Sequence, residues 1–150
     1  MPYATIIKNK IDLEKVVSEL IEKASTKGGG ALVTFIGYVK GEVDGKKVHS
    51  LLYEAYEPYA TKKLLEIAKE ESNREGVIDV QIYHRIRELK PGDISIYIFV
   101  TSKSRAEGFE TARRVLERVK KEVPIFKLEK REDGEYWIVG DKKRIRKLQG

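Results

Sequence analysis

Two lysines near the end of the chain, Lys120 and Lys127, have the type and spacing of residues that could act together. Lys120 belongs to a run of cations that stops at Pro124, and an apolar pair then leads to Lys127. Because proline ends a helix, we expect Lys120 at a helix end and Lys127 on the extended segment that follows. Two ammonium groups placed in this way can converge on one anionic or carbonyl-bearing ligand. A lysine among other cations also gives up its proton more readily, as lysine catalysts require.

Spacing alone does not assign a function to these lysines, because the helix dipole stabilises any lysine near a helix C-terminus. Ser104 and Arg105 present a similar choice, since they begin a predicted helix directly after a strong strand. The free N–H groups at a helix start can bind an anion, and an arginine can add a bidentate phosphate contact. Alternatively, Ser104 is a helix cap and Arg105 a solvated first-turn residue, and spacing alone favours this interpretation.

The remaining residue types exclude several kinds of chemistry. His49 and His84 each stand alone on a predicted strand, so a histidine-rich metal site is not expected. For His84 and Arg85 the favoured interpretation is a hydrogen-bonded histidine within a sheet, beside a surface arginine. The chain has no cysteine, which removes disulfides, thiolate metal sites and a cysteine nucleophile. The glycines at 28–30 lack the lysine and the spacing of a phosphate-binding loop.

The composition limits the class of protein further. The 150 residues suit one domain, expected over residues 1–140, with a basic, mobile tail at 141–150. The net charge of +6 favours an anionic partner, or else serves solubility. The abundance of charged residues and the scarcity of Asn, Gln, Met and Cys resemble thermophile composition. No segment has the length of a membrane span or the pattern of a signal peptide, so we expect a cytoplasmic location.

The elements that must position the candidate residues follow from periodicity. Apolar residues recur at helical spacing over 13–24, 58–75 and 104–122. Strands are predicted at 5–8, 31–40, 48–56, 77–89, 94–101, 125–131 and 135–139. Gly37 interrupts a strand and indicates a bulge or a close backbone approach, whereas 41–47 is predicted as a loop. Hairpins joined by helices predict an α+β fold with a largely antiparallel sheet, in which 77–89 and 94–101 form the central hairpin.

Six short motifs occur in a fixed order along the chain. They are GALVTFIGYVK at 30–40, LYEAYEPYA at 52–60, YHRI at 83–86, VTSKSR at 100–105, FE at 109–110 and KKEVPIFK at 120–127. Together they resemble the motifs of the large, catalytic subunit of molybdopterin synthase, the MoaE family. The resemblance covers residues 4–139 and implies an α/β hammerhead fold with three main helices.

The resemblance also implies an activity. Members of that family transfer sulfur to cyclic pyranopterin monophosphate and so form the dithiolene of molybdopterin. The sulfur arrives as a thiocarboxylate on the C-terminal glycine of a small ubiquitin-like subunit that ends in Gly-Gly. The implied assembly is a heterotetramer built on a homodimer of the large subunit. No metal or organic cofactor is implied for the sulfur transfer itself.

Position by position, the resemblance implies that Lys120 and Lys127 are the catalytic residues. It implies that the substrate contacts Arg105, Ser104, Lys40, Phe35 and Gly37. Lys120 would transfer protons while the sulfur attacks and the cyclic phosphate opens, and Lys127 would stabilise negative charge. Arg105 and the helix start would hold the substrate phosphate.

Three positions depart from the family pattern. Lys40 stands where an arginine is usual, Phe126 where a tryptophan is usual, and Ser104 where a histidine is usual. A lysine keeps the charge but loses the fork of donors, and a serine cannot act as a base near neutral pH. His84 is not expected to replace the missing histidine, because it belongs to a different motif. The two lysines and Arg105 would then have to carry the reaction.

Two alternative functions stay open. Ser104 and Lys40 suggest a subunit of the same fold that binds the ubiquitin-like partner without catalysis. The +6 charge and the basic residues at 142–147 suggest a nucleic-acid-binding domain. Such domains interleave exposed aromatic residues with cations. Here most aromatic residues alternate within apparent core strands, so nucleic acid is the least favoured partner.

Overall fold

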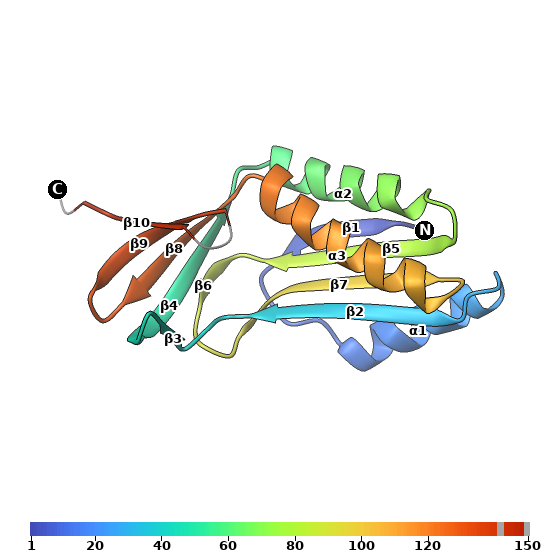
Figure 1. Cartoon of the computed structure of the whole chain (residues 1–150), viewed down its shortest axis with the longest axis horizontal. Helices are drawn as coiled ribbons and strands as arrows, with labels where there is room; N and C mark the ends of the chain where they lie inside the picture. Colours follow the sequence, from blue (N-terminus) through green and yellow to red (C-terminus); the bar gives the residue numbers. More distant parts are fainter. Residues whose placement is uncertain (141–142, 149–150) are drawn as a thin grey trace.

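The computed structural model describes residues 1–140 and 143–148, and in these residues the chain forms three helices and two sheets (Figure 1). The helices are α1 (Leu13–Ser25), α2 (Tyr59–Ser72) and α3 (Arg105–Glu122). The strands are β1 (Tyr3–Ile7), β2 (Ala31–Tyr38), β3 (Glu42–Val43), β4 (Lys46–Ala55), β5 (Val77–Arg85), β6 (Arg87–Leu89), β7 (Ile94–Ser102), β8 (Ile125–Arg131), β9 (Gly134–Val139) and β10 (Lys143–Arg146). The predicted α+β class, with three helices and largely antiparallel sheets, is confirmed. None of the helices in these ranges is long and apolar enough to cross a membrane.

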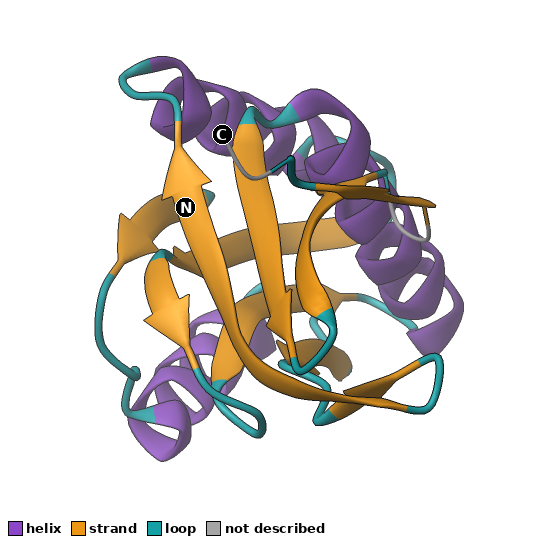
Figure 2. Ribbon diagram, turned by 90° about the vertical axis from the view of Figure 1, so that its left-hand side faces the viewer, coloured by secondary structure: helices purple, strands orange, loops and turns teal. Residues whose placement is uncertain are grey.

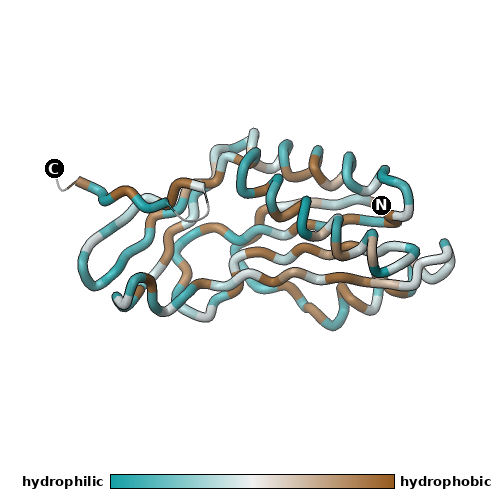
Figure 3. Tube along the Cα trace, viewed as in Figure 1, coloured by the Kyte–Doolittle hydropathy of each residue, from teal (hydrophilic) through white to brown (hydrophobic). Residues whose placement is uncertain are grey.

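The first sheet is covered by helices on both faces. Its strand order is β1-β5-β7-β2, with β1 parallel to β5 and the other neighbours antiparallel, so the predicted central hairpin is confirmed. Helices α2 and α3 lie side by side on one face, and α1 covers the other (Figure 1). Alternate residues of β7 therefore enter two cores. Ile96, Ile98 and Val100 pack beneath α2 and α3, whereas Tyr97 and Phe99 pack beneath α1. Figure 3 shows the apolar residues concentrated along these strands.

The second sheet extends from one end of the first and carries no helix of its own (Figure 2). Its strand order is β10-β9-β8-β4-β3, and β6 also pairs with β4. All of these pairings are antiparallel. This sheet packs on a separate small hydrophobic core. The core is formed by Val39, Val43, Val48, Leu51, Tyr53 and Leu89. The two sheets meet where the chain passes from one to the other, and this junction is where side chains from both can converge.

The segment 77–89, predicted as one strand, is two strands that belong to different sheets. Arg87 has a φ of 89°, and this left-handed residue turns the chain out of β5 and into β6. The predicted loop at 41–47 is also wrong, because β3 pairs with the start of β4. Asp44 and Gly45 have φ values of 53° and 73°, as a tight two-residue hairpin turn requires.

Within the segment predicted as a mobile tail, Lys143–Arg146 form β10 on the edge of β9. Two cations of the predicted tail have carboxylate partners that the sequence pattern did not show. Arg144 donates to the two carboxylate oxygens of Glu129 at 2.8 and 3.1 Å, and Lys147 lies 3.5 Å from Glu135. Residues 141–142 and 149–150 of the predicted tail lie outside the described residues.

Candidate active site

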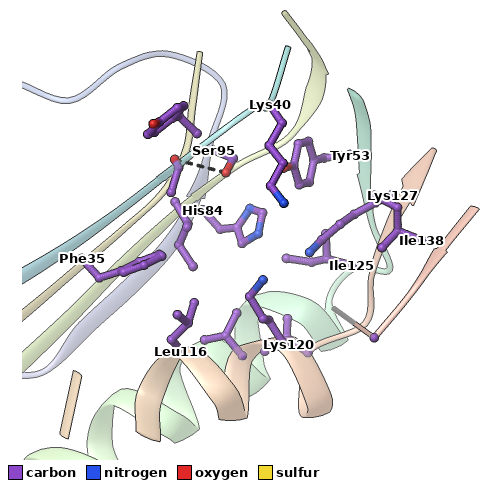
Figure 4. Close-up of a pocket in the computed structure, with 16 residues that line it drawn as sticks. Phe35, Lys40, Tyr53, His84, Ser95, Leu116, Lys120, Ile125, Lys127 and Ile138 are labelled. Carbon is purple, nitrogen blue, oxygen red and sulfur yellow. Dashed lines mark hydrogen bonds between the residues drawn. The ribbon is translucent and has the colours of Figure 1, made fainter. Parts of the chain in front are cut away.

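A cavity of about 290 Å³ opens at the junction of the two sheets, beside the C-terminal end of α3 (Figure 4). The first sheet contributes β2, β5 and β7 to its walls, and the second contributes β4, β8 and β9. Its polar lining side chains are Lys40, Tyr53, His84, Ser95, Lys120 and Lys127, together with the exposed Tyr38.

Lys120 and Lys127 meet in this cavity within one chain. Lys120 lies in the last turn of α3, which ends because Val123 adopts an extended backbone before Pro124. Lys127 is the third residue of β8 and pairs with Tyr53 of β4. Its ammonium lies 5.9 Å from the ring centroid of Tyr53. The predicted placement on a helix end and the following strand is confirmed, and Figure 4 shows both side chains directed into the cavity.

Phe35, Gly37 and Lys40 line the same cavity from β2 and the residues after it. The predicted irregularity at Gly37 is confirmed, because the register between β2 and β7 shifts between Gly37 and Tyr38. A Cβ atom on Gly37 would lie 2.9 Å from Cγ2 of Ile96 and 3.2 Å from the ring of Phe35, so these two side chains occupy the space that a side chain at position 37 would need. Lys40 adds a third ammonium to the site.

Ser104 and Arg105 do not join the other candidates. They lie at the opposite end of α3, and a helix rise of 1.5 Å per residue places Arg105 about 22 Å along the axis from Lys120. Ser104 occupies the N-cap position, and its hydroxyl donates to the carboxylate of Glu107. That hydrogen bond lowers the pKa of Glu107. Within one chain, Arg105 therefore cannot touch a ligand held between the two lysines.

His84 is the residue of the cavity that sequence reasoning missed. Its imidazole is only 4% exposed and lies among the lysines (Figure 4). Nδ1 is 2.8 Å from the backbone carbonyl oxygen of Arg85, and the ring meets Tyr53 edge-on, with centroids 5.5 Å apart. Burial and, to a smaller extent, the ammonium groups of Lys127 and Lys120 lower the pKa of His84 to about 4, against the opposing effect of the backbone hydrogen bond. The imidazole is therefore neutral at neutral pH.

The alternation of inward-facing and outward-facing residues along β5 could have indicated where His84 lies. Val80 and Ile82 face the core beneath α2 and α3, and His84 is the next residue of the same alternation. The prediction of a surface arginine beside it is wrong, because Arg85 is buried on the other face. Its guanidinium donates to the carbonyl oxygens of Lys8 at 3.2 and 3.3 Å and of Ile94 at 3.0 Å.

The neutral state of His84 predicts a loss of stability in acid. A histidine of the unfolded chain titrates at 6.5, whereas the folded protein holds the pKa of His84 at about 4. Between these values the unfolded chain binds a proton that the folded chain does not, so the free energy of unfolding falls as the pH falls. The loss approaches about 3 kcal/mol at the lower end of the window. Urea unfolding across this range would measure it, and a His84→Phe variant with the same pH slope would contradict it.

Two further polar groups help to shape the cavity. Ser95 donates from Oγ to the carbonyl oxygen of Gly37 at 3.3 Å, beside the register shift between β2 and β7. Burial raises the pKa of the Tyr53 hydroxyl, and a hydrogen bond with Ser95 partly opposes this effect. Tyr53 therefore stays a neutral phenol beside the lysines.

A shallower groove continues from the cavity along the second sheet, past Lys120 and Lys127, toward Glu129 and Arg144. Glu129 is only 3% exposed and is held by the two hydrogen bonds from Arg144, with Arg131 3.9 Å away. Sequence reasoning assigned no role to this ion pair, because Arg144 was placed in a mobile tail. The groove gives the site an elongated shape with one deep and one shallow end.

The α+β fold collects three lysines in a cavity between two sheets, and such a site has the charge to bind a small anionic ligand and the side chains to transfer protons. The family model described as MoaE protein matches residues 6–122. The chain is 39% identical over 140 residues to the molybdopterin synthase catalytic subunit of Pyrococcus abyssi, covering 90% of this chain and 95% of the relative. It is 39% identical over 133 residues to that of Bacillus subtilis, covering 89% and 82%.

Solved structures agree with this relationship. Molybdopterin synthase from Staphylococcus aureus matches with a TM-score of 0.77 and 36% identity, covering 89% of this chain and 94% of that chain. The chain belongs to the MoaE family.

Proposed function

We propose that this chain is the catalytic subunit of a molybdopterin synthase. It transfers sulfur from the thiocarboxylate of a small ubiquitin-like protein to cyclic pyranopterin monophosphate, and so builds the dithiolene of molybdopterin. The observation that carries the proposal is the meeting of Lys120 and Lys127 in one cavity of a MoaE-family fold. The same meeting disfavours a binding subunit without catalysis, since the side chains needed for proton transfer are assembled.

The cavity suits the charges of this reaction. Both the phosphate and the thiocarboxylate are anions, and ammonium groups of Lys40, Lys120 and Lys127 surround the space that they would share. When the thiocarboxylate sulfur attacks a side-chain carbon of the pterin, negative charge moves onto oxygen atoms of the phosphate. Lys120 supplies the proton that the departing oxygen needs, and Lys127 stabilises the charge as it develops. Water then hydrolyses the bond between the sulfur and the acyl carbon of the donor, which leaves the sulfur on the pterin and an ordinary C-terminal carboxylate on the donor. Phe35 adds an apolar wall against which the ring system of the substrate can lie.

The groove beside the cavity suits the tail of the sulfur donor. An extended chain that ends in two glycines is narrow enough to pass along Tyr38 and Ile138 and to place its terminal sulfur near the lysines. We propose that this groove, between the cavity and the Glu129–Arg144 ion pair, receives that tail. The proposed sulfur transfer itself requires no cofactor. The cytoplasmic location of the protein and its thermophilic source stay predictions.

Arg105 enters this proposal only through a second copy of the chain. It lies too far from its own cavity, yet it is exposed and has Phe109 one turn further along the same helix face. Phe109 is 64% exposed, and an exposed phenylalanine beside an arginine is typical of a surface that contacts another protein. We propose a homodimer in which Arg105 of each copy binds the substrate phosphate in the cavity of the other, with Ser104 beside it.

A reconstituted assay tests the function. The purified chain is mixed with cyclic pyranopterin monophosphate and a small partner that carries a C-terminal Gly-Gly thiocarboxylate. We expect molybdopterin to accumulate in proportion to the thiocarboxylate consumed. The same partner with an ordinary carboxylate is the matched control and should give no product. Tight binding of the thiocarboxylated partner without any product would instead support the non-catalytic alternative.

A further inference from the structure

Among the described residues, the charged side chains that line the cavity are all donors, whereas the hydroxyls of Tyr38, Tyr53 and Ser95 can both donate and accept. The three lysine ammonium groups can only donate hydrogen bonds, and the Ser95 hydroxyl already donates to Gly37. A pterin, however, carries N–H and O–H groups as well as an anionic phosphate, so it needs an acceptor as well as donors. The cavity must therefore supply an acceptor if it is to fix the orientation of the ring system.

His84 has the geometry of that acceptor. A carbonyl oxygen can only accept, so the 2.8 Å contact with Arg85 places the hydrogen of the neutral imidazole on Nδ1. Nε2 then carries a lone pair, and among the described residues it has no hydrogen-bond partner. Figure 4 shows the ring directed into the cavity between the lysines.

The surroundings of His84 hold this arrangement in place. Arg85 is fixed by its three hydrogen bonds to the carbonyl oxygens of Lys8 and Ile94, so the carbonyl that orients the imidazole cannot shift easily. The edge-on contact with Tyr53 restrains the ring from the second sheet. A ligand that donates a hydrogen bond to Nε2 therefore meets an acceptor that is already held in one orientation.

We propose that His84 is a substrate-binding residue whose Nε2 accepts a hydrogen bond from an N–H or O–H group of the pterin. This inference rests on the proposed function, because it takes the pterin as the ligand of the cavity. The lysines then bind the anionic end of the substrate, and His84 sets which way the ring system lies. Burial, helped by the ammonium groups of Lys127 and Lys120, lowers the pKa of the imidazole, so it stays an acceptor at neutral pH.

Steady-state kinetics of variants test the role. In His84→Phe the acceptor is lost while the ring packing is largely kept, so we expect KM for the pterin to rise about tenfold with little change in kcat. His84→Gln returns an acceptor near the position of Nε2 and should recover part of the loss. His49→Gln changes the exposed second histidine of the chain and should behave as wild type. An unchanged KM in a folded His84→Phe variant, checked by thermal unfolding, would overturn the proposal.

Nitrogen NMR of the wild-type protein gives a second test that needs no variant. The chain has only two histidines, so ¹⁵N-histidine labelling gives a spectrum simple enough to assign. We expect His84 to carry its proton on Nδ1 at neutral pH, and its Nε2 signal to move when cyclic pyranopterin monophosphate is added. A proton on Nε2, or a signal that does not respond to saturating pterin, would refute the inference. A wild-type chain that shows the shift but makes no molybdopterin would contradict the proposed function and leave the binding role intact.

Discussion

Replacing Lys120 by alanine is expected to lower the rate of molybdopterin formation by about 10²–10⁴-fold, because that is the usual contribution of a positioned proton-transfer group. The fold should survive, since the residues that anchor this end of α3 are Val115, Val119 and Val123, and all three stay in place. The reconstituted assay with thiocarboxylated partner measures the rate, and circular dichroism checks the fold. Lys127→Ala should also reduce the rate strongly, because Lys127 lines the same cavity.

Lys121→Ala is the matched control for this prediction. Lys121 is the next residue of α3, has the same side chain, and is exposed outside the cavity. It should keep wild-type turnover, so the pair separates a specific role from a general loss of positive charge. Turnover of Lys120→Ala close to that of Lys121→Ala would show that the lysine mechanism is wrong.

Two inactive variants are expected to restore activity when they are combined in one dimer. If Arg105 serves the cavity of the other copy, a dimer of one Arg105→Ala chain and one Lys120→Ala chain has one intact site and one doubly defective site. Random pairing places half of the dimers in this mixed form, so co-expression should recover about a quarter of wild-type activity. Each variant alone should stay nearly inactive. The measurement is turnover per total chain in the co-expressed sample.

The arrangement within one chain gives the opposite result. If Arg105 acted on its own cavity, every site in the mixed dimer would lack either the arginine or the lysine, and no activity would return. A chain that carries both substitutions, co-expressed with wild type, controls for simple dilution effects. Absence of recovery in the presence of proven mixed dimers would exclude the proposed exchange of Arg105 between copies.

The parts of this structure that the sequence predicted depend on residues close together in the chain. The apolar spacing of α1 and α3 marks both helices, and Pro124 fixes where α3 stops. Because that stop separates Lys120 from Lys127 by a short, stiff connection, their convergence follows from local rules alone. Gly37 is a similar case, since a glycine inside a strong strand indicates a close approach whatever the partner strand is.

The parts that it did not predict depend on contacts between distant segments. Nothing local to 77–89 shows that Arg87 turns the chain into another sheet, because β6 is held there by its pairing with β4. Similarly, the alternation of β5 shows that His84 shares a face with Ile82 but not that this face opens into a cavity. Arg105 is the clearest case, because the motif that assigns it to the substrate contains no information about which copy of the chain it serves.

The pairing of β10 with β9 has a consequence for self-association. Lys143, Arg144 and Arg146 give the outer strand of the second sheet a cationic edge, and such edges resist pairing with a further strand from another molecule. A chain shortened to residue 140 would present the unpaired backbone groups of β9 instead. The shortened chain would also lose the hydrogen bonds from Arg144 to the buried carboxylate of Glu129. Of the two arginines near this carboxylate, only Arg131, at 3.9 Å, would remain. We therefore expect the shortened chain to self-associate more readily than the full chain, and to carry a less well neutralised carboxylate beside the cavity.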